Sequence, residues 1–214
     1  MSPQVAPTPS ERRRLQQRAE VRRLILDATE ALLVADGYEA FSMRRLADRC
    51  GYTAPTIYHH FGDKGGLLDA LLEERFRQMV ERIQQVPEAG DPLETLRRQL
   101  HAFVHFGIEN PTHYRLLTVP RPDETSSPPE SAEESRAIIE VTLSRLARDG
   151  RLRVDAIEEG VQCIWVMLHG LISLQISRPD YAWTESHVDV SLEILLRGLV
   201  TSTRASAVAT PRVG

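Results

Sequence analysis

The stretch GYTAPTIYHHFGDK, residues 51–64, decides the fold of this 214-residue chain. Thr53 is a residue type that caps helix N-termini, and Pro55 suits a first helical turn because its missing N–H has no partner there anyway. Ile57 and Phe61 are four residues apart and predict one inward face. The stretch therefore predicts a short helix that ends at about Phe61. Its exposed surface is predicted to consist of Ala54, Pro55, Thr56, Tyr58, His59 and His60.

Two further helices are predicted immediately before this stretch. A longer one ends at Gly37, and its apolar stripe follows helical spacing. A shorter one is capped by Ser42 and ended by Gly51. Two short helices joined by a tight turn and braced by a longer helix make a helix-turn-helix, whose second helix lies in the DNA major groove. The stripe of the longer helix consists of Leu24, Ile25, Ala28, Ala31, Leu32 and Ala35.

The remainder of the chain is also predicted to be helical, because no segment alternates with period two over a useful length. A Pro- and Ser-rich stretch, 119–135, predicts a mobile loop. The fold class is therefore all-α. Helices are expected at about 63–85, 91–109, 110–117, 136–149, 155–177 and 184–202. The expected domains are a flexible basic N-terminal arm (1–20), a helix-turn-helix DNA-binding domain (21–66), a second helical domain (67–203) and a flexible tail (204–214).

Charge and composition narrow the class of partner and the compartment. Residues 1–64 contain ten Arg or Lys against eight Asp or Glu, a net charge of +2, which leaves −6 for the remainder. The basic N-terminal part suggests an anionic partner such as nucleic acid. No apolar run approaches the roughly 20 residues that span a bilayer, and the start has no apolar core of a secretory signal. With two cysteines far apart, a cytoplasmic protein without a membrane segment is expected.

Residues 22–70 resemble the DNA-binding domain of the tetracycline-repressor (TetR) family of bacterial transcription regulators. The most specific part of the resemblance is PTIYHHF, followed three residues later by Lys64. The resemblance implies a homodimer that binds a palindromic double-stranded DNA operator, a small-molecule effector, and bases or sugars touched from the positions of Arg44, Ala54, Pro55, Thr56, Tyr58 and His59. It further implies phosphate contacts at Ser42, His60 and Lys64, and Thr53 completes the expected DNA-binding set. Ala54 replaces a longer polar residue frequent in the family, which suggests weaker direct readout.

The resemblance also implies that 67–203 is an effector-binding and dimerisation domain. This C-terminal part resembles a TetR subgroup named for its Trp, His and Gly. The matching residues are Trp165, His169 and Gly170, and NPTHYRLLT, 110–118, resembles another stretch of that subgroup. The side chains expected to line an apolar effector cavity are Phe103, Phe106, Tyr114, Trp165 and His169. Each of them could equally be core, and His169 is either a satisfied buried histidine or a ligand contact.

The last predicted helix carries an apolar stripe that is too wide to leave in water. Its members recur at helical spacing from Val188 to Leu199. Paired with the 155–177 helix, this stripe would build half of a two-fold four-helix interface between identical chains. The residues expected at the dimer interface are Ile172, Leu192, Leu195 and Leu199.

Other functions find less support in the sequence. No Gly-rich phosphate loop or local Ser-His-acid motif occurs, and the histidines do not follow zinc-site spacing, so neither an enzyme nor a cofactor is predicted. His59 and His60 make a poor metal pair because adjacent helical residues point about 100° apart. The main prediction is a repressor released by a small apolar ligand. The alternative is a TetR-like activator or nucleoid-type binder without an effector, and residues 12–23 are either a solvated face or a DNA-binding arm.

Overall fold

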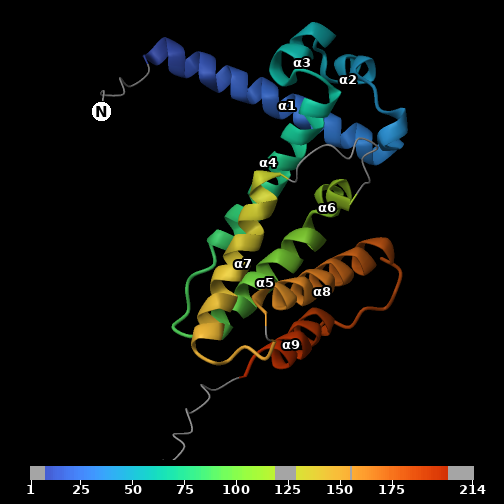
Figure 1. Ribbon diagram of the computed structural model, residues 1–214. Helices are drawn as coiled ribbons and strands as arrows, with labels where there is room; N and C mark the ends of the chain where they lie inside the picture. Colours follow the sequence, from blue (N-terminus) through green and yellow to red (C-terminus); the bar gives the residue numbers. More distant parts are fainter. Residues whose placement is uncertain (1–7, 119–128, 155, 202–214) are drawn as a thin grey trace, which may run out of the picture. The chain divides into compact units, whose positions relative to one another are not determined.

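The computed structural model describes residues 8–118, 129–154 and 156–201, and these are almost entirely helical (Figure 1). Within these ranges no strand forms, and the sole pairing of extended backbone is an isolated bridge between Leu152 and Val200. The all-α prediction is therefore confirmed. The described residues divide into two compact units, one comprising 8–74 with 115–118, and the other comprising 75–114 with 129–154 and 156–201.

The N-terminal unit contains the predicted helix-turn-helix. Ser42 caps α2, where its hydroxyl accepts a hydrogen bond from the Arg45 N–H, and Gly51 ends this helix with φ 71°. Thr53 caps α3 by accepting from the Thr56 N–H, so both predicted helices and both caps are confirmed. The unit consists of α1 (Pro9–Ala40), α2 (Met43–Cys50), α3 (Ala54–Phe61) and the first part of α4 (Lys64–Gln84).

Helix α1 begins much earlier than the sequence analysis predicts. The Thr8 hydroxyl accepts from the Glu11 N–H, and the Glu11 carboxylate accepts from the Thr8 N–H at 2.7 Å, which together form a capping box. Pro9 occupies the first helical position, where proline is favoured. The expected flexible arm is therefore helical from residue 9, while residues 1–7 lie outside the described part. Gly37 interrupts the helix with φ 77°, as predicted, and one further turn follows it.

The buried face of α1 differs from the predicted stripe. Ile25 and Leu32 are buried as expected, whereas Leu24 is exposed and Leu26 is buried in its place. Thr29 shares this face, because its hydroxyl donates to the Ile25 carbonyl at 2.8 Å and so enters the core with its polar atom satisfied. A stripe counted from apolar residues alone omits this threonine and is therefore displaced around the helix.

The N-terminal core also includes the start of α4. Leu67, Leu71 and Leu72 pack in one cluster with Ile57 and Phe61 of α3. The domain boundary predicted after residue 66 thus falls within a helix whose first leucines belong to the N-terminal core, and the two compact units divide instead between Glu74 and Arg75.

The C-terminal unit is a helical bundle in which α5 packs against α7, α8 and α9. Helix α7 begins at Glu130, six residues before the predicted start, and Glu130 and Glu133 in its first turn favour a helix N-terminus. The predicted loop is therefore wrong for 130–135, and its part 119–128 lies outside the described residues. The predicted tail, 204–214, also lies outside them. The unit contains the rest of α4, the first part of α6 (Pro111–Thr118) as far as Tyr114, and the whole of α5 (Pro92–Glu109), α7 (Glu130–Arg148), α8 (Ile157–Ser177) and α9 (His187–Leu199).

Candidate functional site

Helix α3 separates its side chains into a buried and an exposed set, as predicted. Ile57 is fully buried and Phe61 nearly so, whereas Pro55 and His59 are exposed. Tyr58 is 46% exposed, in agreement with its predicted place on the exposed surface. The remaining predicted contact residues of this helix, Ala54, Thr56 and His60, are half-buried. The exposed face thus offers a phenol, an imidazole and small side chains to a partner.

The two threonines of α3 are hydrogen-bonded to each other. The Thr53 and Thr56 hydroxyl oxygens lie 2.9 Å apart, and the Thr53 hydroxyl also caps the helix. Each hydroxyl can donate one hydrogen and accept two, so the pair retains acceptor capacity for a further group. Thr56 is thereby held in one orientation before any partner binds.

Helix α2 contributes arginines with different surroundings. The guanidinium of Arg45 donates to the Asp36 carboxylate at 2.8 Å and to the Ala40 carbonyl at 3.0 Å, so it ties α2 to the end of α1. Arg44, the predicted DNA contact, is exposed, as is Ser42 beside it. Arg44 therefore lies on the surface, whereas Arg45 stabilises the contact between α2 and the end of α1.

Lys64, a predicted phosphate contact, is held against the end of α1. Its ammonium donates to the Phe41 carbonyl at 3.4 Å and lies 4.1 Å from the centre of the Tyr38 ring. A cation over an aromatic face is attracted by the ring quadrupole. The sequence analysis missed Tyr38 and Phe41 as partners, although two aromatic residues flanking a helix end were the available signal.

His60 lies close to the basic part of α1. Partial burial lowers its pKa most, and the positive charges of Arg18, His59 and Arg22 lower it further. The Arg22 guanidinium lies 4.8 Å from the centre of the Phe61 ring. The C-terminal end of α3 therefore adjoins positively charged α1 side chains.

Four of the five predicted effector residues meet around one imidazole in the C-terminal unit. The Tyr114 hydroxyl lies 2.7 Å from His169 Nδ1, and the rings of Phe103, Tyr114 and Trp165 have centroids 5.4–5.8 Å from that of His169. Burial lowers the pKa of His169, which favours the neutral ring. Phe106 contacts His113 instead. Trp165 is 62% exposed, so this indole lies at the surface of the unit and does not line an enclosed interior.

The residues predicted to form the dimer interface are buried within a single chain. Ile172, Leu192, Leu195 and Leu199 all belong to the core of the C-terminal unit. A second chain is therefore not needed to keep the stripe of α9 out of water. The stripe packs on the other helices of its own unit, which a reading of one helix at a time cannot detect.

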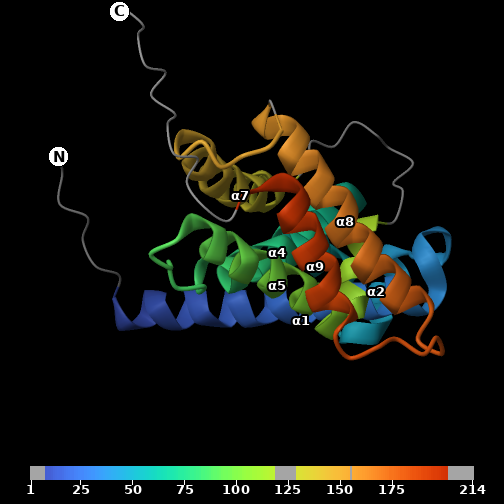
Figure 2. The same cartoon turned by 90° about the horizontal axis from the view of Figure 1, so that it is seen from below.

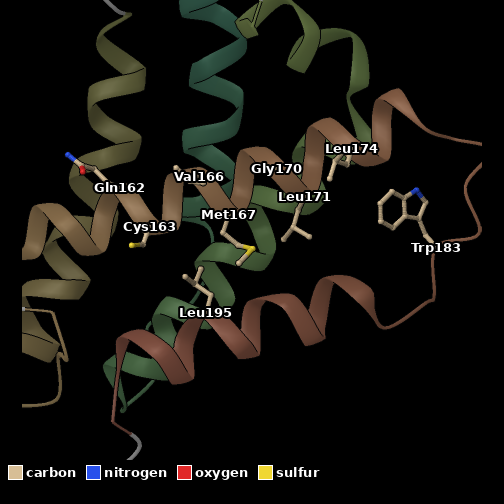
Figure 3. A pocket seen from close by; sticks show the side chains of 9 residues that line it. All are labelled: Gln162, Cys163, Val166, Met167, Gly170, Leu171, Leu174, Trp183 and Leu195. Carbon is tan, nitrogen blue, oxygen red and sulfur yellow. The ribbon is translucent and has the colours of Figure 1, made fainter.

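A different apolar surface is exposed on α8 and α9, which lie side by side (Figure 2). Val166 is 71% exposed and Ile194 64% exposed. Between these helices runs an open groove of about 590 Å³, shown in Figure 3, where Trp183 lies on the connection between α8 and α9. The groove is lined by Gln162, Cys163, Val166, Met167, Gly170, Leu171, Leu174, Trp183 and Leu195.

Comparison with known proteins identifies the family. Residues 25–71 match the family described as "Bacterial regulatory proteins, tetR family", and residues 96–199 match "Tetracyclin repressor-like, C-terminal domain". The chain belongs to the tetR family. It is accordingly a transcriptional regulator that binds DNA through its helix-turn-helix. The subgroup suggested by Trp165, His169 and Gly170 stays a prediction.

Named relatives in the tetR family include repressors and an activator. The HTH-type transcriptional repressor AcnR of Corynebacterium efficiens is 30% identical over 145 residues, which cover 63% of this chain and 70% of AcnR. The repressor KstR of Rhodococcus jostii is 25% identical, with 83% of each chain covered. The activator FasR of Mycolicibacterium smegmatis is 25% identical, with 86% of this chain and 81% of FasR covered.

Solved structures of the tetR family share the fold. A regulator from Marinobacter aquaeolei superposes with a TM-score of 0.73 at 19% identity, covering 86% of this chain and 98% of that one. A regulator from Shewanella gives 0.71 at 17% identity, with 85% and 98% covered. At these identities the likeness establishes the fold and leaves the ligand open.

Helix α8 also meets the length and composition expected of a membrane span, with a mean hydropathy of 1.3, which the sequence analysis did not expect. One such helix in the described part of the chain is weak evidence, because a core helix of a soluble protein has the same character. Ile164, Leu168 and Ile172 place one side of α8 in the core.

Among the described residues, no three His, Cys, Asp or Glu side chains gather as metal ligands.

Proposed function

We propose that this tetR-family regulator is a homodimeric repressor that binds a palindromic operator and is released by a small, mainly apolar effector. The observation that carries the proposal is the exposed face of α3, with Thr56 held by Thr53 and with Tyr58 and His59 directed away from the core. Small residues at the start of a recognition helix allow close approach to base edges, and phenol and imidazole groups reach phosphates.

Base readout is assigned to the first turns of α3 and to Arg44 of α2. Thr56 can hydrogen-bond a base or contact a thymine methyl group, and the Arg44 guanidinium suits paired acceptors on guanine. Phosphate contacts are assigned to Ser42, His60 and Lys64. Lys64 has three N–H donors and gives one to Phe41, so donors remain for a phosphate.

Dimerisation is assigned to the exposed face of α8 and α9. Val166 and Ile194 are large apolar side chains in water, and the groove between their helices is almost wholly apolar. Exposed apolar patches of this kind mark interaction sites, and a two-fold axis repeats one patch on both partners. Two half-sites of a palindrome require two such chains.

The effector region is assigned to the cluster around His169. A neutral imidazole with Tyr114 on Nδ1 offers its Nε2 as a polar anchor within aromatic walls. An effector that favours the DNA-incompetent state must weaken DNA binding by the same factor by which DNA weakens effector binding, commonly about 5- to 150-fold. A movement of α4 would transmit effector binding to the DNA-binding helices, because α4 begins at Lys64 in the N-terminal unit and ends in the C-terminal unit.

The second candidate function is that of an activator, which differs from the proposed repressor in raising transcription. Repression is supported by the names of AcnR and KstR, and activation by that of FasR. A reporter gene placed behind the operator separates the two, because a repressor lowers expression and an activator raises it. Either regulator would act in the cytoplasm, where bacterial DNA is accessible.

The proposal is tested by sequencing the genomic DNA that the purified protein retains and by titrating the recovered duplex. Wild type should prefer an inverted repeat over random duplex. Thr56→Val should cost roughly 1 to 3 kcal/mol at particular base pairs while random-duplex affinity stays the same. Equal affinity of wild type for recovered and random duplexes would refute specific operator binding.

Release by an effector has a separate test. A thermal-shift screen of apolar metabolites should yield a compound that stabilises the protein and weakens operator binding. His169→Phe keeps an aromatic ring, removes the polar anchor and should abolish both effects. A stabilising compound that leaves operator affinity unchanged would show that its site is not the switch.

A further inference from the structure

The first four turns of α1 carry a row of arginines. Arg14, Arg18 and Arg22 recur every four residues and therefore share one face of the helix. Residues 9–20 are all exposed, and in Figure 1 this part of α1 projects beyond α2 and α3 of the same unit. A helix rises 1.5 Å per residue, so the row is about 12 Å long. Burial therefore does not explain Arg14 and Arg18.

The arginine row adjoins the recognition helix α3. Its last member, Arg22, stacks its guanidinium on the Phe61 ring at the end of α3. The charges of Arg18 and Arg22 both reach His60, one residue earlier, and contribute to lowering its pKa. The row therefore starts at the C-terminal end of the recognition helix and leads away from it.

The surroundings of the row are strongly basic. Residues 9–23 contain six arginines and two glutamates, which gives a net charge of +4 in a protein whose total is −4. The capping box at Thr8 and Glu11 fixes the helix start, so the row is held in helical geometry. A rigid cationic row suits an extended anion with regularly spaced charges, and the DNA backbone has one phosphate per 3.4 Å of each strand.

We infer that the N-terminal extension of α1 is a second DNA contact, in which Arg14 and Arg18 bind phosphates that flank the half-site read by α3. This inference rests on the proposed operator binding and adds to it a footprint longer than the recognition helix alone would give. Arginine side chains in such a row neutralise phosphates without reading bases. The extension therefore raises affinity for any flanking sequence.

The test compares Arg14→Gln/Arg18→Gln with the control Arg13→Gln/Arg23→Gln. Both variants remove two charges, and glutamine is a good helix former, so circular dichroism should show unchanged helicity. The control residues are exposed on the opposite side of α1. The DNA probes are a recovered operator trimmed to its half-sites, the same operator with ten added base pairs at each end, and a long random duplex. Affinity is measured across a salt series.

The row variant should bind the flanked operator with a salt slope smaller by about 3.6, since each phosphate contact contributes about 0.9 and the proposed dimer loses two contacts at each half-site. The trimmed operator and the control variant should keep the wild-type slope. Equal slopes for both variants on flanked DNA, or an equal change on trimmed DNA, would overturn the inference. The random duplex keeps this comparison valid if no specific operator exists, because phosphate contacts do not depend on sequence.

Discussion

The Tyr114 hydroxyl lies 2.7 Å from His169 Nδ1 and 3.1 Å from the carbonyl oxygen of the same histidine. A phenol has a single hydrogen to donate. When that hydrogen goes to the carbonyl, Nδ1 must carry the imidazole proton and donate to the phenol oxygen, which leaves Nε2 as an acceptor. This pair therefore joins α6 to α8 and also determines what the imidazole can offer to an effector.

Tyr114→Phe should lower the free energy of unfolding by about 1 to 3 kcal/mol, because the buried Nδ1–H of His169 loses its acceptor and the His169 carbonyl loses the phenol donor. Urea denaturation followed by circular dichroism measures the change. Tyr181→Phe is the matched control, since Tyr181 is exposed and its loss of a hydroxyl should cost less than about 0.5 kcal/mol. Equal stability of the two variants would show that the Tyr114–His169 hydrogen bonds contribute nothing net.

Lys64→Met should produce two separable effects, because this ammonium contacts Phe41 and Tyr38 and is also assigned to a phosphate. Loss of the cation from the Tyr38 ring should reduce stability by about 0.5 to 2 kcal/mol. The salt slope of operator binding should also fall by about 1.8, because the proposed dimer loses one phosphate contact of about 0.9 at each half-site. Tyr38→Leu removes only the ring contact, so it should reduce stability and leave the slope intact. A slope unchanged in Lys64→Met would restrict Lys64 to a structural role.

The helix-turn-helix could be predicted closely because its signals are local. Ser42, Gly51 and Thr53 each determine a helix end through their own backbone or hydroxyl group, so no knowledge of distant residues is needed. The sequence analysis does not predict the start of α1, although its capping box is equally local, because it treats residues 1–20 as a flexible basic arm. Local chemistry at Thr8 and Glu11 outweighs composition there.

The effector and dimer regions were less predictable because they depend on packing between distant segments. Helical spacing identifies an apolar stripe on α9 and does not say which neighbour covers it. Leu192 and Leu199 are covered by their own unit, while Ile194, between them in sequence, is exposed. The convergence of Phe103, Tyr114 and His169 likewise joins three helices far apart in sequence.

Val166→Asp/Ile194→Asp should separate the proposed dimer, because both side chains are exposed in the single chain and a charge there opposes apolar contact. Sedimentation over a range of concentrations should show a dimer for wild type and a monomer for the variant. Val141→Asp, at an exposed position of α7, is the control and should remain dimeric. Leu199→Asp would not serve, since Leu199 is buried and the charge would unfold the unit. A dimeric double variant would place the interface elsewhere.

The ion pair of Asp91 with Arg151 should make the C-terminal unit sensitive to acid. The guanidinium donates to both carboxylate oxygens, at 2.6 and 3.3 Å, and its hydrogen bond is the largest cause of the lowered pKa of Asp91. A carboxyl whose pKa is lower in the folded than in the unfolded chain stabilises the fold above its unfolded pKa, about 3.9. That stabilisation is lost as pH falls through the folded pKa.

Asp91→Asn isolates this pair, because asparagine caps helix α5 about as well as aspartate does. At pH 7 the variant should be less stable by about 1.5 kcal/mol, the low end for a charged hydrogen bond, because the Asp91 side chain is 46% exposed. Arg151 is only 7% exposed and loses its charged partner in the variant. Urea denaturation at pH 7 and at pH values below 4 should show the difference between wild type and variant shrinking as the wild-type carboxylate becomes protonated. A difference that stays constant with pH would assign the stabilisation to the cap and not to the charge.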